Sequence, residues 1–521
     1  MADFRVAAVF SDNCVLQRDK NVSVFGEGPD GSVVYVTILG GTYHGKIRNG
    51  RWTVIIPPMK AQNGITMEVR CADNVRVFRN IAVGEVWLAG GQSNMELEIH
   101  TMKGGEELLK TDKEPNVRFY YTQKIAVMDD AFFEAERNTA WSEFGEEAAR
   151  AWSAVGYLFA KKLAAALNVT VGIIGCNWGG TSSSCWMSRE TLLEDEELSS
   201  YVDEYDRAIE GKSVEQQKRE YAEYEEYNRK WDEAAAKIYA VDPCISWDKL
   251  QKKLGPNKWP GPMCCVNPFR PAGLYECMLK RVMPYTLKGF LYYQGESDDH
   301  KPRMYYKLFC RLIRHWREDW NDDELPFLFV QLPMHRYSAD PDYKHWCLIR
   351  EAQQRAFRTV KNTGMAVIID AGEFNEIHPK DKEPVGERLF RQAMYHVYHL
   401  MDEKDAFGPM YDSCIYRDGG MELFFRHADG GIVVKDRVLG FEIAGEDRQY
   451  YPADAQVRGN SIFVKSDAVP EPVYARYLWT NYGDVNLFGE NGIPVEPFRT
   501  DRNDEASSGN ADIKIQQVME L

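Results

Sequence analysis

The chain has 521 residues, a length that predicts two to four domains rather than one core. Hydrophobic residues make up 44% and charged residues 27%, as in a soluble globular protein, and no apolar run is long enough to span a bilayer. The net charge of -16 opposes binding to phosphate backbones and anionic lipids, so nucleic acid and membrane surfaces are excluded as expected partners.

The N-terminus and the cysteines indicate the compartment. Residues 1–5 lead directly into strand-like sequence, without a charged n-region or an apolar h-region. We therefore expect a cytoplasmic chain, or a secreted one if a signal was trimmed. The 11 cysteines are odd in number and scattered, which is typical of reduced core residues. The adjacent Cys264 and Cys265 have no CxxC partner pair, so a zinc site is not expected. We expect no other metal and no cofactor.

Residues 1–82 are predicted to form an N-terminal β-sandwich-like domain. Short alternating or apolar runs are separated there by Gly, Asp, Asn and Pro turns. The clearest runs are 22–26, 33–38, 52–56 and 66–70.

Residues 83–406 show a different pattern, in which continuously apolar runs alternate with helical periodicity. Such alternation predicts an α/β domain with a doubly wound parallel sheet, because strands buried on both faces are apolar throughout. Strands are expected at 84–89, 169–175, 289–293, 327–332 and 365–370, and helices at 151–167, 304–320, 348–360 and 384–400.

Two further segments complete the chain. Residues 190–260, rich in Glu, Lys, Tyr and Ala, predict exposed helices inserted at the rim of the sheet, either a solvated hairpin or a lid. Residues 407–521 predict a C-terminal β-rich domain, with the last dozen or so residues as a loose tail.

Ser93 lies in the stretch Gly90 to Glu96, directly after a predicted strand. Open α/β sheets bind ligands at the carboxyl ends of their strands, and the glycines leave room for a substrate beside the hydroxyl. Ser93 is therefore a candidate nucleophile. Alternatively it caps the next helix, with Glu96 completing a capping box.

A serine nucleophile requires a base, and the base requires an orienting acid. His378 follows the last predicted strand of the α/β layer, and Glu376, two residues earlier in an extended loop, would point to the same side. In contrast, His315 falls within a predicted helix and is interpreted as structural.

Two more strand ends carry complementary chemistry. Gln294 and Glu296 flank a glycine, so the amide could donate to a developing oxyanion. Glu296 is either a second acid or the partner of a nearby basic residue. Gly179 and Gly180, followed by small hydroxyl residues, expose backbone N–H groups of the kind that form an oxyanion hole.

In this order the motifs resemble the SGNH hydrolases, and within them the sialate O-acetylesterase-like carbohydrate esterases. The resemblance covers nearly the whole chain. It rests on residues 9–18, 84–88, 91–95, 178–181, 294–297, 377–379 and 386–389.

The resemblance implies an SGNH hydrolase domain flanked by β-rich domains, with Ser93 as nucleophile and His378 as general base. It also implies an oxyanion hole made by the Ser93 and Gly179 or Gly180 backbone N–H groups and the Gln294 side chain. The family has Asp two or three residues before the histidine, whereas this chain has Asn375 and Glu376. Glu296 therefore stands as an alternative acid.

The implied function is a serine-dependent carboxylic ester hydrolase that removes acetyl groups from sugars, either 9-O-acetylated sialic acid or acetylated hemicellulose oligosaccharides. A sialate site requires an arginine for the carboxylate. The candidates for it are Arg189, Arg336 and Arg350. The other substrate-binding candidates are Gln92, Asn94, Trp178, Trp186 and Tyr293, whose aromatic rings could stack on a sugar or pack the strand ends.

Two other functions stay open. A lipid esterase or thioesterase on the same fold would have an apolar acyl tunnel and prefer long-chain esters. A non-catalytic carbohydrate-binding protein would use its β domains instead, but an intact Ser93, Gln294 and His378 argue against it.

Overall fold

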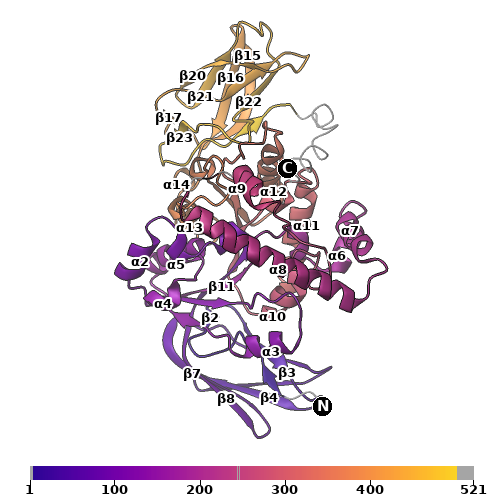
Figure 1. Cartoon of the computed structure of the whole chain (residues 1–521). Coiled ribbons are helices and arrows are strands. Elements are labelled where there is room, and N and C mark those ends of the chain that lie inside the picture. Colours follow the sequence, from indigo (N-terminus) through magenta and orange to yellow (C-terminus); the bar gives the residue numbers. More distant parts are fainter. Residues whose placement is uncertain (1–3, 243–244, 246, 502–521) are drawn as a thin grey trace. The chain divides into compact units, whose positions relative to one another are not determined.

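The computed structural model describes residues 4–242, 245 and 247–501 (Figure 1). The chain divides into two compact units. The first comprises Met1–Gln294 and Lys307–Phe327, and the second comprises Gly295–Tyr306 and Leu328–Leu521. The predicted C-terminal tail lies outside the described residues.

The first unit begins with a β region. One sheet has the order β1-β3-β6, and β4, β5 and β7 join a larger sheet. Burial alternates along β4, whose Val34, Val36 and Ile38 are buried, because successive side chains of a strand point to opposite faces. The bounds are β1 (Arg5–Val6), β2 (Val15–Gln17), β3 (Val22–Glu27), β4 (Val33–Ile38), β5 (Gly41–Lys46), β6 (Arg51–Ile56) and β7 (Gln62–Cys71), which confirms the predicted strands.

Strand β8 (Asn74–Gly91) connects this region to the central sheet. Its first half pairs antiparallel with β7, and its second half pairs parallel with β11 and β12. The strand continues without a break through residues 82 and 83, where composition predicts a domain boundary. The two β regions therefore share one strand, and the predicted boundaries stay a prediction.

The central sheet of this unit has the order β10-β9-β11-β8-β12. Strands β9 (Val117–Tyr121), β11 (Val171–Asn177) and β12 (Gly289–Tyr293) run parallel with β8, and the short β10 (Ser142–Glu143) is antiparallel. Every residue of β11 and β12 is buried, which explains why these strands are continuously apolar. The fold is thus a mixed α/β fold with a central mixed sheet and further β-rich sheets.

The helices of the first unit include those predicted in the insertion. Helix α8 has 26 residues and buries only Gln217, Tyr221, Trp231 and Ala235. Helix α5 begins at Ala154 rather than 151, because the Ser153 hydroxyl accepts the Gly156 N–H and caps it. The bounds are α1 (Ser93–Glu96), η1 (Ile99–Thr101), α2 (Gly105–Thr111), α3 (Asp130–Arg137), α4 (Glu146–Ala149), α5 (Ala154–Leu167), η2 (Ser183–Trp186), α6 (Arg189–Leu193), α7 (Ser199–Ile209), α8 (Val214–Tyr239), α9 (Trp247–Leu254), the π-helix η3 (Tyr275–Leu279), α10 (Lys280–Val282) and α11 (Tyr305–Trp320).

The second unit contains β13 (Phe327–Gln331), α12 (His345–Thr359), β14 (Thr363–Val367) and α13 (Glu383–His396). Helix α13 ends four residues before the predicted 400, and His399 adopts a positive φ of 54° that no α-helix permits. The other short helices are η4 (Glu296–Asp298), η5 (Ile369–Ala371) and α14 (Glu403–Ala406).

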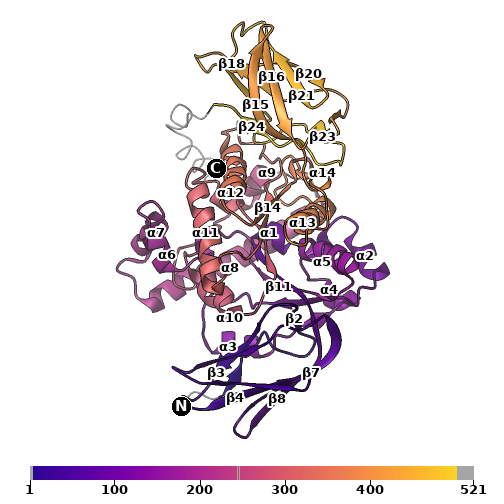
Figure 2. The ribbon, with the colours of Figure 1, turned by 180° about the vertical axis from the view of Figure 1, so that it is seen from behind.

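The rest of the second unit is β-rich, as predicted (Figure 2). One sheet has the order β15-β16-β21-β20, another β19-β18-β22-β24, and β17 pairs with β23. The bounds are β15 (Met410–Arg417), β16 (Gly420–Arg426), β17 (Ile432–Val434), β18 (Phe441–Ala444), β19 (Tyr451–Pro452), β20 (Asp454–Arg458), β21 (Ser461–Lys465), β22 (Tyr474–Tyr477), β23 (Leu487–Gly489) and β24 (Phe498–Arg499).

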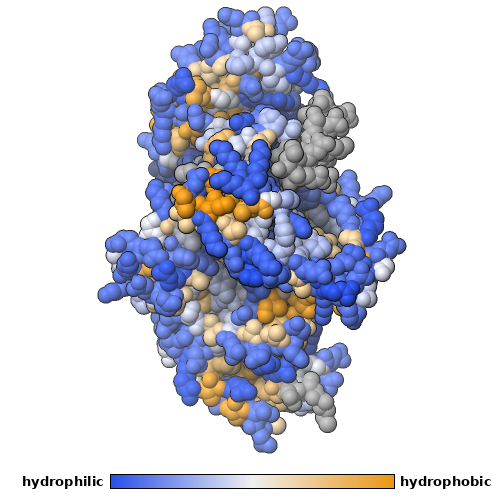
Figure 3. All heavy atoms as spheres, in the orientation of Figure 1, coloured by the Kyte–Doolittle hydropathy of each residue, from blue (hydrophilic) through white to orange (hydrophobic). Residues whose placement is uncertain are grey.

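The surface is largely hydrophilic on the face drawn in Figure 3, with apolar residues in scattered groups. No helix in the described part of the chain combines the length and apolar character needed to cross a membrane. Each described cysteine is free of a disulfide.

Candidate active site

Ser93 stands on a turn that only glycine can form. Gly91, the last residue of β8, has a φ of 131°, and a Cβ there would lie 2.1 Å from the Tyr293 carbonyl oxygen. The chain therefore turns sharply and presents Ser93, half-buried, as the first residue of α1.

The capping interpretation of Ser93 is wrong. The N-cap residue of α1 is Gln92, and Ser93 already lies within the helix. Glu96 does not complete a capping box either. Its Oε2 accepts the backbone N–H of Gly179 at 2.5 Å, and its Oε1 accepts from Lys124 Nζ, also at 2.5 Å.

A second glycine turn lies against the first. The Trp178 N–H donates to the Gly91 carbonyl at 3.1 Å, and a Cβ on Gly179 would lie 3.3 Å from the Ser93 Cβ. The structure thus brings Ser93 and the 179–180 turn together. Because Glu96 occupies the Gly179 N–H, Gly180, with a φ of 75°, is the better candidate for the second backbone donor.

Gln294 is buried directly after β12, and its amide is held in one orientation. Its Oε1 accepts from Ser183 Oγ at 2.6 Å, and its Nε2 donates to the Thr181 carbonyl at 3.2 Å. An amide nitrogen carries two hydrogens. One N–H of Gln294 donates to the Thr181 carbonyl, and the direction of this bond fixes the direction of the second N–H.

The predicted substrate-binding residues are largely buried. Trp186 and Tyr293 have no exposed surface, and the Trp186 indole donates to Thr181 Oγ1 at 3.0 Å. A ring without an exposed face cannot stack on a sugar, so for these two the stacking interpretation is wrong and they pack the strand ends. Asn94 is fully buried and Gln92 nearly so, whereas Trp178 is partly exposed.

His378 belongs to the second unit, in a loop that is not extended as predicted. Asn375 has a φ of 62°, and Glu373 and Glu376 form an antiparallel bridge across the turn. Glu376 Oε1 accepts the backbone N–H of His378 at 2.8 Å and lies 3.8 Å from its Nδ1. Glu376 is therefore beside the imidazole, but its carboxylate is bonded to the backbone rather than to the ring.

Glu296, in the same unit, is buried in a charged environment. Burial lowers the pKa of Lys382 to about 7, and the negative charge of Glu296 partly offsets this effect. Burial also raises the pKa of Asp299 to about 8, with Asp298, Asp340 and Glu296 adding to the shift. Glu296 thus interacts with a buried lysine that sequence reasoning missed.

Lys382 did leave a weak signal in the sequence. It is the N-cap residue of α13, two residues before Pro384. Lysine is unusual at a helix N-terminus because the helix dipole disfavours a cation there. No comparable signal pointed to the pairing of Glu96 with Gly179, which are 83 residues apart.

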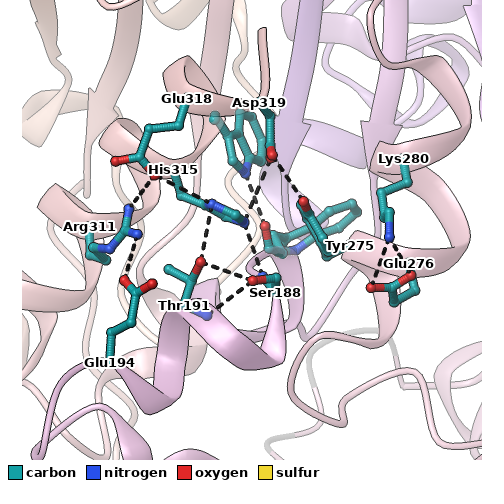
Figure 4. A network of polar contacts seen from close by, with 12 residues as sticks. Ser188, Thr191, Glu194, Tyr275, Glu276, Lys280, Arg311, His315, Glu318 and Asp319 are labelled. Carbon is teal, nitrogen blue, oxygen red and sulfur yellow. Dashed lines mark hydrogen bonds and ion pairs between the residues drawn. The ribbon is translucent and has the colours of Figure 1, made fainter. Parts of the chain in front are cut away.

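His315 lies in a separate network within the first unit (Figure 4). Its Nε2 accepts the Ser188 N–H at 3.1 Å, and its Nδ1 lies 3.2 Å from Thr191 Oγ1. The Ser188 hydroxyl instead caps α6 by accepting the Thr191 N–H. No serine hydroxyl shown in this network bonds to the imidazole, so the cluster ties α6 to α11 and supports the structural interpretation of His315.

Among the residues that the structure describes, no group of three or more His, Cys, Asp or Glu side chains is arranged to hold a metal ion.

Known proteins resemble this chain over most of its length. A family model described as "Carbohydrate esterase, sialic acid-specific acetylesterase" matches residues 265–393. Sialate O-acetylesterase of Mus musculus is 27% identical over 423 residues, covering 74% of this chain and 72% of the mouse protein. The Homo sapiens protein of the same name is 25% identical over 549 residues, covering 95% and 92%.

A solved structure agrees with these relatives. The crystal structure of a carbohydrate acetylesterase from Xanthomonas citri has a TM-score of 0.75 and 27% identity, covering 96% of this chain and 100% of that one. Fold and comparisons together define the class of protein as a carbohydrate esterase. Within that class, the chain is similar to sialate O-acetylesterases.

Proposed function

We propose that this protein is a carbohydrate O-acetylesterase, a carboxylic ester hydrolase that releases acetate from acetylated sugars. The observation that carries the proposal is the Ser93 turn. A half-buried hydroxyl lies against a second glycine turn, in a chain that shares its fold with a carbohydrate acetylesterase over 96% of its length.

We further propose the SGNH arrangement of roles, on a doubly wound sheet. Ser93 attacks the acetyl carbonyl while His378 takes its proton. The N–H groups of Ser93 and Gly180 and the side chain of Gln294 stabilise the oxyanion. His378 then gives this proton to the departing sugar oxygen, which leaves as the free hydroxyl, and activates the water that releases acetate. The fixed amide of Gln294 supports its assignment, because a preorganised donor costs no reorientation during the reaction.

For the acid we propose Glu376, which lies beside the imidazole of His378. Its Oε1 accepts the backbone N–H of His378, so it holds the loop in a shape that keeps the carboxylate beside the ring. Glu296 stays the alternative acid, although its negative charge interacts with the buried Lys382.

The choice between sialic acid and neutral sugars depends on an available arginine. Arg350 is buried and donates to the Pro333 and Thr480 carbonyls, and Arg189 pairs with Asp206 at 2.5 Å. Arg336 lies over the ring of the exposed Phe374, and its carbonyl accepts the Asn375 N–H beside the His378 loop. Of the three candidates, Arg336 is therefore the one that could bind a sialate carboxylate.

The test is acetate release from 9-O-acetylated sialic acid and from acetylated xylo- and manno-oligosaccharides by wild type and Ser93→Ala. We expect Ser93→Ala to lose at least a thousandfold in kcat on every substrate that wild type hydrolyses. Unchanged turnover would refute the serine mechanism, and preference for long-chain esters would favour a lipid esterase.

A further inference from the structure

The insertion places an exposed aromatic side chain beside the proposed oxyanion hole. Trp259 follows α9 and is 43% exposed. A Cβ added to Gly180 would lie 2.8 Å from Trp259 Cζ2 and 3.0 Å from Phe269 Cε1. The 179–180 turn therefore packs directly against both rings.

The Trp259 ring contacts Phe269 on one side and is exposed to solvent elsewhere. The two rings meet edge to face, with centroids 5.4 Å apart and planes at 69°. Phe269 is itself half-buried and supports the indole on the side where the two rings meet. This combination of one supported edge and exposed surface is what a stacking site for an amphipathic ligand requires.

The segment that carries Trp259 is fixed by helix α8. Tyr227 donates its hydroxyl to the Pro256 carbonyl at 2.6 Å, and the Trp231 indole donates to the Gly255 carbonyl at 3.1 Å. The Trp259 N–H donates to Asn257 Oδ1 at 2.8 Å. A ligand platform gains affinity when its position is preorganised, and the contacts from α8 preorganise Trp259.

We propose that Trp259 is the sugar-binding platform of the active site, and that the insertion is therefore part of the substrate site. With an acetyl oxygen at the Gly180 N–H, the pyranose ring that carries the ester lies over the indole. The C–H face of a sugar ring is apolar enough to cover an aromatic ring, while its hydroxyls stay in water. This inference rests on the proposed carbohydrate esterase function. It adds the residue that makes the enzyme prefer acetyl esters of sugars to acetyl esters of small alcohols.

Trp247 provides a matched control. It also lies on the insertion and is 42% exposed, but its ring packs against Trp231, with centroids 5.3 Å apart. Trp247→Ala removes an equally exposed indole from the same insertion, and because Trp231 also bonds to the Gly255 carbonyl, it controls for any loosening of the segment that carries Trp259.

The experiment measures kcat and KM of wild type, Trp259→Ala, Trp259→Phe and Trp247→Ala on an acetylated xylo-oligosaccharide and on ethyl acetate, which has no ring. We expect Trp259→Ala to raise the KM for the sugar ester about three- to tenfold, and more than the KM for ethyl acetate. Trp259→Phe should recover part of the loss, and Trp247→Ala should match wild type.

Each outcome decides between the two proposals. Equal rises on both esters, or the same sugar KM in Trp259→Ala as in Trp247→Ala, would overturn the platform while leaving the esterase proposal intact. If wild type released acetate from ethyl acetate but from no acetylated sugar, the carbohydrate function would fail and the platform with it. Trp259→Phe provides the same comparison if the alanine variant does not fold.

Discussion

At the scale of single residues, the carboxylate proposed to orient His378 lies beyond hydrogen-bond distance of the ring. Glu376 Oε1 stands 3.8 Å from Nδ1, and both side chains are about 40% exposed, at 44% and 40%. Solvent weakens electrostatic interactions between groups this exposed, so Glu376 is expected to act mainly by orienting the ring.

We predict that Glu376→Gln lowers kcat roughly ten- to a hundredfold, less than the loss of a fully buried triad acid, because the imidazole loses its orienting charge. Glu296→Gln should lower kcat less and instead lower the pKa of Lys382 further, since the Glu296 charge now raises it. Steady-state kinetics of the two variants measure this difference. A larger loss of kcat in Glu296→Gln would make Glu296 the acid.

We expect Glu96 to position the proposed oxyanion hole. Its carboxylate ties the Gly179 N–H and Lys124 to the helix that begins with Ser93. Hydrogen bonds to a charged group contribute about 1.5–3 kcal/mol, so Glu96→Gln should loosen the 179–180 turn.

We predict that Glu96→Gln lowers kcat about tenfold and leaves the KM for sugar esters within about twofold, because the turn holds the transition state rather than the sugar. Lys124→Met, which leaves the carboxylate on Gly179, is the matched control and should cost less. Full activity of Glu96→Gln would show that the turn holds its shape without this carboxylate.

At the scale of elements, the network around His315 stabilises the packing of α6 on α11 (Figure 4). Asp319 accepts the Tyr275 hydroxyl at 3.0 Å, and burial raises its pKa from 3.8 to about 6. The folded protein thus binds this proton more tightly than the unfolded chain. The ionised carboxylate costs stability above about pH 6, and the cost fades as the pH falls towards 4.

Asp319→Asn, which mimics the protonated form, is predicted to raise the free energy of unfolding at pH 8 by roughly 1–3 kcal/mol. The gain should shrink as the pH falls to 4 and vanish near pH 2, where Asp319 is protonated in both states. Denaturant unfolding at pH 4, 6 and 8 measures this trend. Glu318→Gln, on the same helix but 45% exposed, should change little, and an equal effect of both variants would contradict the burial argument.

His315 contributes with the opposite sign. Burial lowers its pKa to about 4, so the fold favours the neutral ring. The stability that the neutral His315 ring gives the fold is fully present above pH 6.5, the pKa of the unfolded chain's histidine. It is lost as the pH falls towards 4. The two groups therefore oppose one another between pH 4 and 6, and only the difference between wild type and Asp319→Asn isolates the carboxylate.

At the scale of the whole molecule, the net charge of -16 acts on any charged substrate. An anionic sugar approaching the chain meets a repulsive field, whereas a neutral one does not. Salt screens this field, since the Debye length falls from about 30 Å at 0.01 M to about 8 Å at 0.15 M.

We predict that kcat/KM for acetylated sialic acid rises about two- to threefold between 0.01 and 0.15 M NaCl, while that for acetylated xylo-oligosaccharides stays constant. Initial rates over a salt series measure the effect, with the neutral sugar as internal control. A fall in kcat/KM for the sialate ester would show that a local cation such as Arg336 outweighs the net charge.

The sequence alone determined the elements and the positions of chemistry along the chain. Strands such as β11 and β12 are continuously apolar because the sheet buries both of their faces, and a glycine pair before Ser93 is a local requirement for a sharp turn. Local patterns of this kind are readable because their cause lies within a few residues. Helix ends were less accurate, since the Ser153 cap and the turn at His399 depend on single backbone angles.

Only the tertiary structure decided which groups touch. The Glu96 carboxylate occupies the Gly179 N–H, the Trp186 ring is buried, and Trp259 lies against Gly180. Each of these pairings or burials depends on segments far apart in the chain, and no local periodicity encodes them. Sequence therefore located Ser93 at a strand end, whereas the fold showed that the 179–180 turn lies against it and that the exposed Trp259 lies against this turn.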